Sequence, residues 1–550
     1  MMNEIKQKSV SSKFDAERNS LPYVFCLPTE TLEDIFIQRA RDYQSWQGGL
    51  PRPTVPNWVN VSYVCSHWRS VALNCAPLWT HLFITSPRWT EELLARSKQA
   101  PLTVYVNTHY EDNISRSHFV EEVMNRLERI QELRLYLSTI SDHQILSKLS
   151  SPAPSLKSLE IWMKGSPSEF SSVLYGVTPA LRTLALADYP APWYSTKLSG
   201  LTTLTLYRVP LRFRQHTVEL LATLRCMQHL KHLYLYSALT SAVGFLSSTA
   251  FHTFQKFTLP HLSRLLLVAP LSTVVAMLSC VNIPSKTEIK LECEFEQGSS
   301  LDDFAALSSL LAQRYNMSVN QAPSSSIIRS FAIDVGRKMM NLWLAFSALE
   351  RDCVFDAHVP DEEWDCNIPL TLMVGFGESM TTDREERIMI MGDICCSIPL
   401  TNVQSVHVIN PPFRSVFWKK LLGHVPNVRY LKLSSGDMPE LPSVLSVTPR
   451  DGAENHDRHA DQDPWMFAPA LDELELNCIT FPPPARERDK DTFATDIQSL
   501  YDALSTRRES RGQLIMSPFC YEETKCGHTS MGMVGRWEGG HFHVDKLWPC

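Results

Sequence analysis

The sequence predicts a mixed α/β protein, in which a small N-terminal helical bundle is followed by an irregular solenoid of short parallel strands and helices. Two observations lead to this fold class. Between residues 27 and 79, apolar residues recur at the spacing of one helical face. Between residues 130 and 476, a Leu-x-x-Leu-x-Leu pattern recurs ten times, with other apolar residues at some of the leucine positions.

Composition indicates a folded protein. Of the 550 residues, 44% are hydrophobic and 20% are charged, and the net charge is −7 with a pI near 6.2. This balance disfavours nucleic acid and membrane surfaces as the main partners. We expect neither.

Residues 1–20 are polar and lack the apolar run of a secretion signal, so a disordered tail is expected. No stretch of about eighteen apolar residues is present, so no membrane-spanning helix is expected. The fourteen cysteines are scattered through the chain. This usage favours reduced thiols in the cytosol or nucleus, and a protein that is not secreted.

The first helical segment begins near Pro28. Leu32, Ile35 and Phe36 follow at i, i+3 and i+4, which places them on one helical face. Pro28 suits the first turn of a helix, and Glu30 lies near its positive end.

A second helical segment follows a gap at residues 41–56 that is rich in glycine and proline and is expected to loop out. Asn57 is the predicted N-cap. The apolar stripe of this segment consists of Val61, Val64, Cys65, Trp68, Val71 and Ala72, and Leu78 and Trp79 add a bulky anchor. From periodicity alone, the two segments could simply be a helical hairpin that packs on the rest of the chain.

The residues themselves are Leu-Pro-x-Glu-x-Leu-x-x-Ile-Phe, then Val-Cys-x-x-Trp-Arg-x-x-Ala, then Leu-Trp. Over residues 21–85 this set resembles the F-box of fungal F-box proteins, a helical bundle that binds the Skp adaptor of cullin–RING ubiquitin ligases. The resemblance implies a first docking face made of Leu27, Pro28, Leu32, Ile35 and Phe36. It implies core and second-face contacts from Val64, Cys65, Trp68 and Trp79. The gap at 41–56 is longer than the linker of a compact F-box.

The repeated pattern begins at residues 130, 156, 181, 201, 230, 262, 328, 403, 428 and 471. The first six copies follow one another every 20–32 residues, which is close to the period of leucine-rich repeats. The paired leucines alternate with period two, so both should point inward from a short strand, and stacked units would bury them. Ile289-Lys-Leu291 and Leu370-Thr-Leu372 are candidate degenerate copies. An ordinary α/β domain with Leu-rich strands is the alternative.

These patterns predict a repeat region at residues 86–480, interrupted by a polar, disordered insertion at about 436–466. The remaining residues, 481–550, are expected to hold a linker, a helix over 497–504 that caps the array, and a tail.

The predicted strands present aromatic residues outward, directly after the paired leucines. These are Tyr136, Trp162, Tyr207 and Tyr236, which could form a ladder across neighbouring repeats. Tyrosine and tryptophan are favoured as binding anchors, so the ladder is a candidate target-binding surface. The alternative is that these rings cover strand edges.

The sequence offers no convincing catalytic constellation. No phosphate-binding glycine loop, dinucleotide fingerprint or nucleophile elbow is present. Possible metal ligands gather near the C-terminus without the usual zinc spacing, so a loose tail is favoured over a metal site. They are Cys520, Cys526, His528, His541, His543 and Cys550. Cys395-Cys396 lies in an apolar run and is expected to be core. We expect no catalytic residue, cofactor or metal.

Together the resemblance and the repeats favour a non-catalytic adaptor. The F-box-like helices would bind the Skp adaptor and, through it, cullin, while the repeats would bind a target protein. The alternatives are a repeat scaffold outside any ligase, and an enzyme of a type that the motifs do not reveal.

Overall fold

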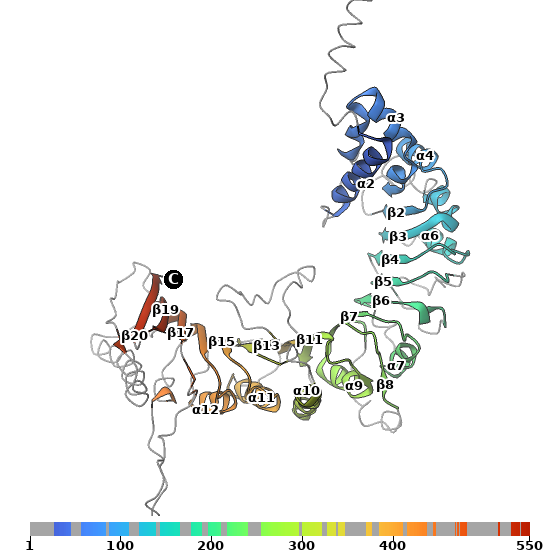
Figure 1. Cartoon of the computed structure of the whole chain (residues 1–550). Coiled ribbons are helices and arrows are strands. Elements are labelled where there is room, and N and C mark those ends of the chain that lie inside the picture. Colours follow the sequence, from blue (N-terminus) through green and yellow to red (C-terminus); the bar gives the residue numbers. More distant parts are fainter. Residues whose placement is uncertain are drawn as a thin grey trace, which may run out of the picture. The chain divides into compact units, whose positions relative to one another are not determined.

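The computed structural model (Figure 1) describes residues 27–45, 57–83, 87–108, 120–138, 143–164, 178–189, 196–210, 217–239, 255–295, 300–321, 327–336, 339–346, 370–376, 384–410, 415–436, 444–446, 468, 470–471, 473–480, 515–516, 530–538 and 541–549. The predicted tail at 1–20, the predicted helix at 497–504 and most of the gap at 41–56 and of the insertion at 436–466 lie outside the described residues. The chain divides into two compact units, residues 1–201 and 202–550. They are called the N-terminal and C-terminal units below.

The N-terminal unit begins with a helical bundle. Its elements are α2 (Thr29–Ser45), η2 (Asn57–Tyr63), α3 (Ser66–Asn74) and η3 (Ala76–Trp79). Large aromatic side chains fill the space between them. The Phe36 ring lies 5.1 Å from the Trp68 ring, and the Trp58 ring lies 5.3 Å from the Trp79 ring. Helices this short are stabilised by such packing more than by their intrinsic propensity.

The single helix predicted from Asn57 to Ala72 is wrong, because the structure divides it at Cys65. A 3₁₀-helix ends at Tyr63, and α3 begins at Ser66. Cys65 has extended backbone angles, and its Sγ accepts a hydrogen bond from the Trp68 backbone N–H at 3.4 Å. Cys65 therefore acts as an N-cap, and Tyr63 and Val64 fall at the break instead of on a continuous apolar face.

Parallel strands follow the bundle within the same unit. They are β1 (His81–Phe83), β2 (Leu102–Asn107), β3 (Ile130–Leu137), β4 (Ser158–Met163) and β5 (Thr183–Ala187), and each pairs with the next. The connecting helices are α4 (Pro87–Arg96), η4 (Leu127–Arg129) and α6 (His143–Lys148), and η6 (Thr196–Gly200) follows β5. Since β1 pairs with β2, the end of the predicted F-box segment is itself the first strand of this sheet.

The C-terminal unit begins with a second run of parallel strands. In sheet order these are β6 (Thr203–Tyr207), β7 (His232–Tyr236), β9 (Arg264–Pro270), β11 (Glu288–Phe295) and β14 (Leu370–Phe376). Helices α7 (Thr217–Arg225), α9 (Leu271–Cys280) and α10 (Asp302–Gln321) lie along this run (Figure 1). A small parallel pair, β8 (Phe257–Thr258) and β10 (Val281–Asn282), accompanies it.

One strand then runs in the opposite direction to both of its neighbours, which was not predicted from the sequence. Strand β13 (Met339–Ala345) pairs antiparallel with both β14 and β12 (Ser330–Val335). Strand β12 pairs in parallel with β15 (Ser405–Ile409), followed by β16 (Tyr430–Gly436) and β17 (Glu473–Thr480). Helices α11 (Arg384–Ser397) and α12 (Ser415–His424) lie on one side of these strands (Figure 1).

The C-terminal end carries strands that were also not expected. Strand β19 (Ser530–Glu538) pairs antiparallel with β17 and with β20 (His541–Pro549), and β18 (Ile515–Met516) pairs with β20. The expectation of a loose tail does not describe residues 530–538 and 541–549, because these residues extend the sheet.

All ten copies of the repeated pattern end in a strand. Aligned positions of neighbouring strands carry the paired apolar residues, so that Leu133 faces Leu159 and Leu159 faces Leu184. Almost all paired positions are fully buried; Leu476 lies at a position whose burial is not described. The candidate copies at Ile289 and Leu370 also lie in paired strands, β11 and β14. The predicted fold class is confirmed as a mixed α/β protein with mostly parallel strands.

Candidate functional site

Three large apolar side chains of the helical bundle are exposed. Ile35 of α2 is 43% exposed, Tyr63 at the end of η2 is 70% exposed, and Val64 in the break before α3 is 50% exposed. Pro28 is exposed and Leu27 is half-buried. Seven large hydrophobic residues are exposed among those that the structure describes, and three of them belong to this short bundle. Exposed apolar side chains on a folded bundle are candidates for a surface that binds a protein.

Two residues predicted for the docking face lie in the core of the bundle instead. Leu32 and Phe36 are fully buried, and so is Trp79 at 1% exposure. The apolar face of α2 turns inward because Phe36 packs on Trp68, so Leu32 and Phe36 cannot contact a partner while the bundle is folded. This corrects their predicted role. Cys65 and Trp68 are half-buried, and both help to hold the start of α3.

Trp79 makes several contacts in the core of the bundle. Its indole Nε1 donates to the Ala72 carbonyl at 2.7 Å, and the guanidinium of Arg96 lies 4.4 Å from the ring. Burial, and then the nearby Arg41, lowers the pKa of His81 to about 4. The bundle and α4 therefore share an apolar core that stabilises the exposed surface from within.

A row of aromatic rings crosses the strands of the N-terminal unit. The Tyr105 and Tyr136 rings are 5.1 Å apart, and the Tyr136 and Trp162 rings are 5.8 Å apart and nearly parallel at 8°. All three rings are half-buried. We call Tyr105, Tyr136 and Trp162 the aromatic platform. Tyr105 was not predicted from the sequence, because β2 lacks the repeated pattern. The alternation of buried and half-buried residues along β2 marks Tyr105 as outward-facing.

Glu160 lies at the centre of this platform. Its Oε1 accepts a hydrogen bond from the Tyr136 hydroxyl at 2.9 Å and another from Trp162 Nε1 at 2.6 Å. Its Oε2 lies 3.4 Å from Arg134 Nε. Burial, and next the Glu160 carboxylate, raises the pKa of the Tyr136 hydroxyl, which therefore stays protonated as a donor.

The other two predicted rings, Tyr207 and Tyr236, lie in the C-terminal unit. Their centroids are 5.1 Å apart with an angle of 55°, and the Arg208 guanidinium lies 4.9 Å from the Tyr207 ring. Each pair of rings is thus adjacent within its own unit. These contacts do not test the prediction that all four rings form one continuous ladder.

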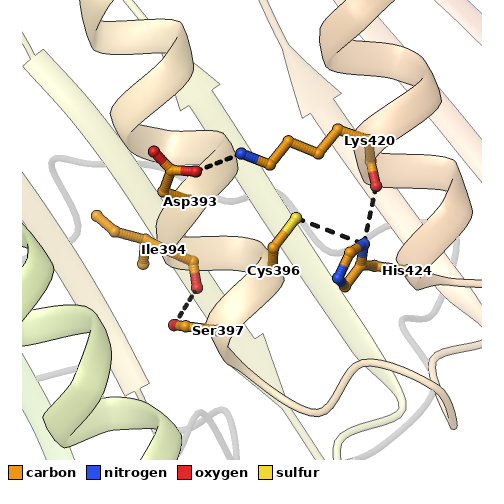
Figure 2. A network of polar contacts seen from close by, with 6 residues as sticks. All are labelled: Asp393, Ile394, Cys396, Ser397, Lys420 and His424. Carbon is orange, nitrogen blue, oxygen red and sulfur yellow. Dashed lines mark hydrogen bonds and ion pairs between the residues drawn. The ribbon is translucent and has the colours of Figure 1, made fainter.

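A thiol and an imidazole come together on the helical side of the C-terminal unit (Figure 2). Cys396 of α11 has its Sγ 3.5 Å from His424 Nδ1 of α12, and that nitrogen is 3.0 Å from the Lys420 carbonyl. A carbonyl only accepts, so Nδ1 must carry the proton and donate. It cannot then take a proton from the Cys396 thiol. An ion pair between Lys420 and Asp393 also joins the two helices.

The Cys396 thiol is therefore part of a helix–helix contact and not an activated nucleophile. Burial raises its pKa, and the nearby Lys420 only partly opposes this. The adjacent Cys395 is fully buried, as predicted for a core residue.

We expect Cys396 to react slowly with iodoacetamide at neutral pH, about tenfold more slowly than the exposed Cys226, because little thiolate is present. Mass spectrometry of the labelled peptides measures both rates in one sample. Replacing His424 by alanine should change the Cys396 rate less than about threefold, since Nδ1 does not act as its base. Labelling of Cys396 faster than that of Cys226 would contradict this interpretation.

No group of three or more His, Cys, Asp or Glu residues suited to hold a metal is found within the described part of the chain. Of the C-terminal residues considered above, Cys520, Cys526, His528 and Cys550 lie outside that part, while His541 and His543 belong to β20. Among the helices described, none is long and apolar enough to cross a membrane.

The helical bundle with its exposed apolar residues is the part of the chain for which a comparison with known families finds a match. The model of the F-box-like family matches residues 24–85, which covers this bundle and the first strand. Residues 24–85 are therefore an F-box-like domain. No curated protein matches the chain.

Proposed function

We propose that this chain is the substrate-recognition adaptor of a Skp–cullin–F-box ubiquitin ligase. The F-box-like match over residues 24–85 carries the proposal, because F-box domains generally bind Skp adaptors. The exposed Ile35, Tyr63 and Val64 support it, since they offer an apolar surface on an ordered bundle. In this role the protein works inside the cell, in the cytosol or nucleus, and through the adaptor it is joined to cullin.

The strands form the second half of the proposed adaptor. We take the repeated pattern, its buried leucines and the parallel pairing as a degenerate leucine-rich-repeat solenoid, interrupted by the reversal at β13. The proposed target-binding residues are Tyr136, Trp162, Tyr207 and Tyr236, now joined by Tyr105.

The proposed contribution to ubiquitin transfer is proximity and not bond chemistry. A target held on the strands is brought near the enzyme that carries ubiquitin, which raises the effective concentration of the target at that enzyme.

The test is affinity purification of the full chain from cells, followed by identification of the bound proteins. We expect both a Skp adaptor and a cullin. Replacing Ile35 and Val64 together by aspartate should reduce adaptor recovery at least about tenfold, because two charges then face an apolar interface. The matched control replaces two exposed apolar residues of the C-terminal unit, Met389 and Val416, by aspartate, and recovery should not change.

Each outcome assigns the function differently. Adaptor without cullin would indicate a scaffold outside any ligase. If neither the adaptor nor a cullin is recovered, both the ligase role and the scaffold role are contradicted. Full recovery from the Ile35 and Val64 variant would show that the adaptor binds another surface of the domain.

A further inference from the structure

The aromatic platform is held in one arrangement by Glu160. A single carboxylate oxygen accepts from both the Tyr136 hydroxyl and Trp162 Nε1, at 2.9 and 2.6 Å. The bond from Tyr136 links neighbouring strands, since Tyr136 lies in β3 and Glu160 in β4, while the bond from Trp162 lies within β4. The nearly parallel rings follow from this shared anchor, so the surface is pre-organised before any partner binds.

The same bonds restrict what the platform can offer to a partner. The hydroxyl of Tyr136 and the indole N–H of Trp162 already donate to Glu160. They do not offer donors to an anionic or carbonyl group of a target. What remains is the negative electrostatic character of aromatic faces and the charge of the carboxylate, and both attract cations.

The charged side chains beside the platform are of both signs. Glu132, Arg134 and Glu160 occupy outward positions of β3 and β4, and the exposed Lys164 follows Trp162 by two residues. The attraction for a cation therefore rests on the Glu160 carboxylate itself, which lies beside the two rings. Arg134 is 53% exposed and its contact with Glu160 Oε2 is long, at 3.4 Å. An exposed pair of this kind contributes little, and Arg134 can swing away when another cation arrives.

We propose that the aromatic platform binds a basic side chain of the target protein, with Glu160 as the residue that selects it. The arginine or lysine would lie against the Tyr136 and Trp162 rings with its charge toward the Glu160 carboxylate. This inference rests on the proposed function, because it names the chemistry of the target at the proposed target-binding surface.

The test is selection of peptides from a random twelve-residue phage-display library on the immobilised full chain. Peptides are kept when the paired change of Tyr136 and Trp162 to leucine abolishes their binding. We expect these peptides to share one arginine or lysine. In a synthetic copy, replacing that arginine by citrulline, or that lysine by norleucine, should weaken binding about tenfold on the unmodified chain.

A variant of Glu160 separates charge from geometry. Glu160→Gln keeps a carbonyl oxygen that can accept from both rings but removes the charge. On this variant the uncharged peptide should bind about as well as the basic peptide, within about twofold, which is the coupling expected of a direct pair. Glu160→Ala should also alter the near-ultraviolet circular dichroism of Trp162, because the ring loses its anchor. The control is Glu292→Gln, a half-buried glutamate of β11 in the C-terminal unit, which should leave binding unchanged.

The possible failures are distinct. Platform-dependent peptides with no basic residue, or with acidic ones, would overturn the selection by Glu160 but leave the target-binding surface in place. If no peptide depends on the platform, both the selection by Glu160 and the target-binding surface itself are overturned. An unchanged preference for the basic peptide on Glu160→Gln would also overturn the proposal. Adaptor recovery is measured separately, so none of these results depends on it.

Discussion

Replacing Phe36 by alanine is expected to unfold the F-box-like domain, at a cost of about 3–5 kcal/mol. The Phe36 side chain is fully buried and its ring packs at 5.1 Å on Trp68, so its removal leaves a cavity in the centre of a small bundle. A bundle of this size has little stability to lose. Hydrogen exchange of the full chain, followed by mass spectrometry, should show loss of protection over α2 and α3.

The neighbouring residue provides the matched control. Ile35 is 43% exposed, so Ile35→Ala should cost less than about 1 kcal/mol and leave protection unchanged. Strands β3 to β5 should remain protected in both variants if the bundle opens on its own. Retained protection of α2 in the Phe36 variant would show that the bundle core is not where we place it. Loss of adaptor binding by the Phe36 variant is not informative about docking, whereas loss by the Ile35 and Val64 variant is.

Replacing Arg314 by methionine is expected to destabilise the C-terminal unit by about 2–4 kcal/mol. The guanidinium of this α10 residue donates to four backbone carbonyls, at 2.9–3.3 Å, in the turn before β11. The acceptors are Ile283, Pro284, Ser285 and Thr287. Methionine retains much of the apolar stem but supplies no donor, so these carbonyls lose their charged partner.

Urea denaturation of the full chain, followed at the amides of α10 and β11 by hydrogen exchange, measures this effect. Arg314→Lys should recover only part of the stability, because an ammonium cannot span four carbonyls as the planar guanidinium does. The control is Arg225→Met at the exposed end of α7, with a change within about 0.5 kcal/mol. An Arg314→Met variant as stable as the control would show that the turn holds its shape without the arginine.

The strands were predictable because their signal is local. A leucine at each end of an L-x-L pair points to the same side of a strand, and the structure buries both, as at Leu204 and Leu206. The reversal at β13 was not predictable, since its direction depends on which neighbours it meets. Six of its seven residues are buried, so the strand lacks the alternation that marks one inward and one outward face.

The docking surface was only partly predictable for a related reason. Helical spacing groups Leu32, Ile35 and Phe36 on one face, but it does not say whether that face meets solvent, a partner or the protein's own core. The packing of Trp68 against Phe36 decides this. The alternation of the strand places Glu160 on its outward side, but the sequence does not reveal that two rings from neighbouring strands share one of its oxygens.

The unusual strand order of the C-terminal unit has a consequence for how the chain is made. Strand β11 ends at Phe295, but one of its two neighbours is β14, which begins at Leu370. During synthesis β11 therefore presents a free edge until β12, β13 and β14 have all left the ribosome, and free edges invite pairing with other chains. A chain that stops between residues 296 and 369 would keep that edge permanently, so the C-terminal unit is expected to accumulate in soluble form only when translation passes this point.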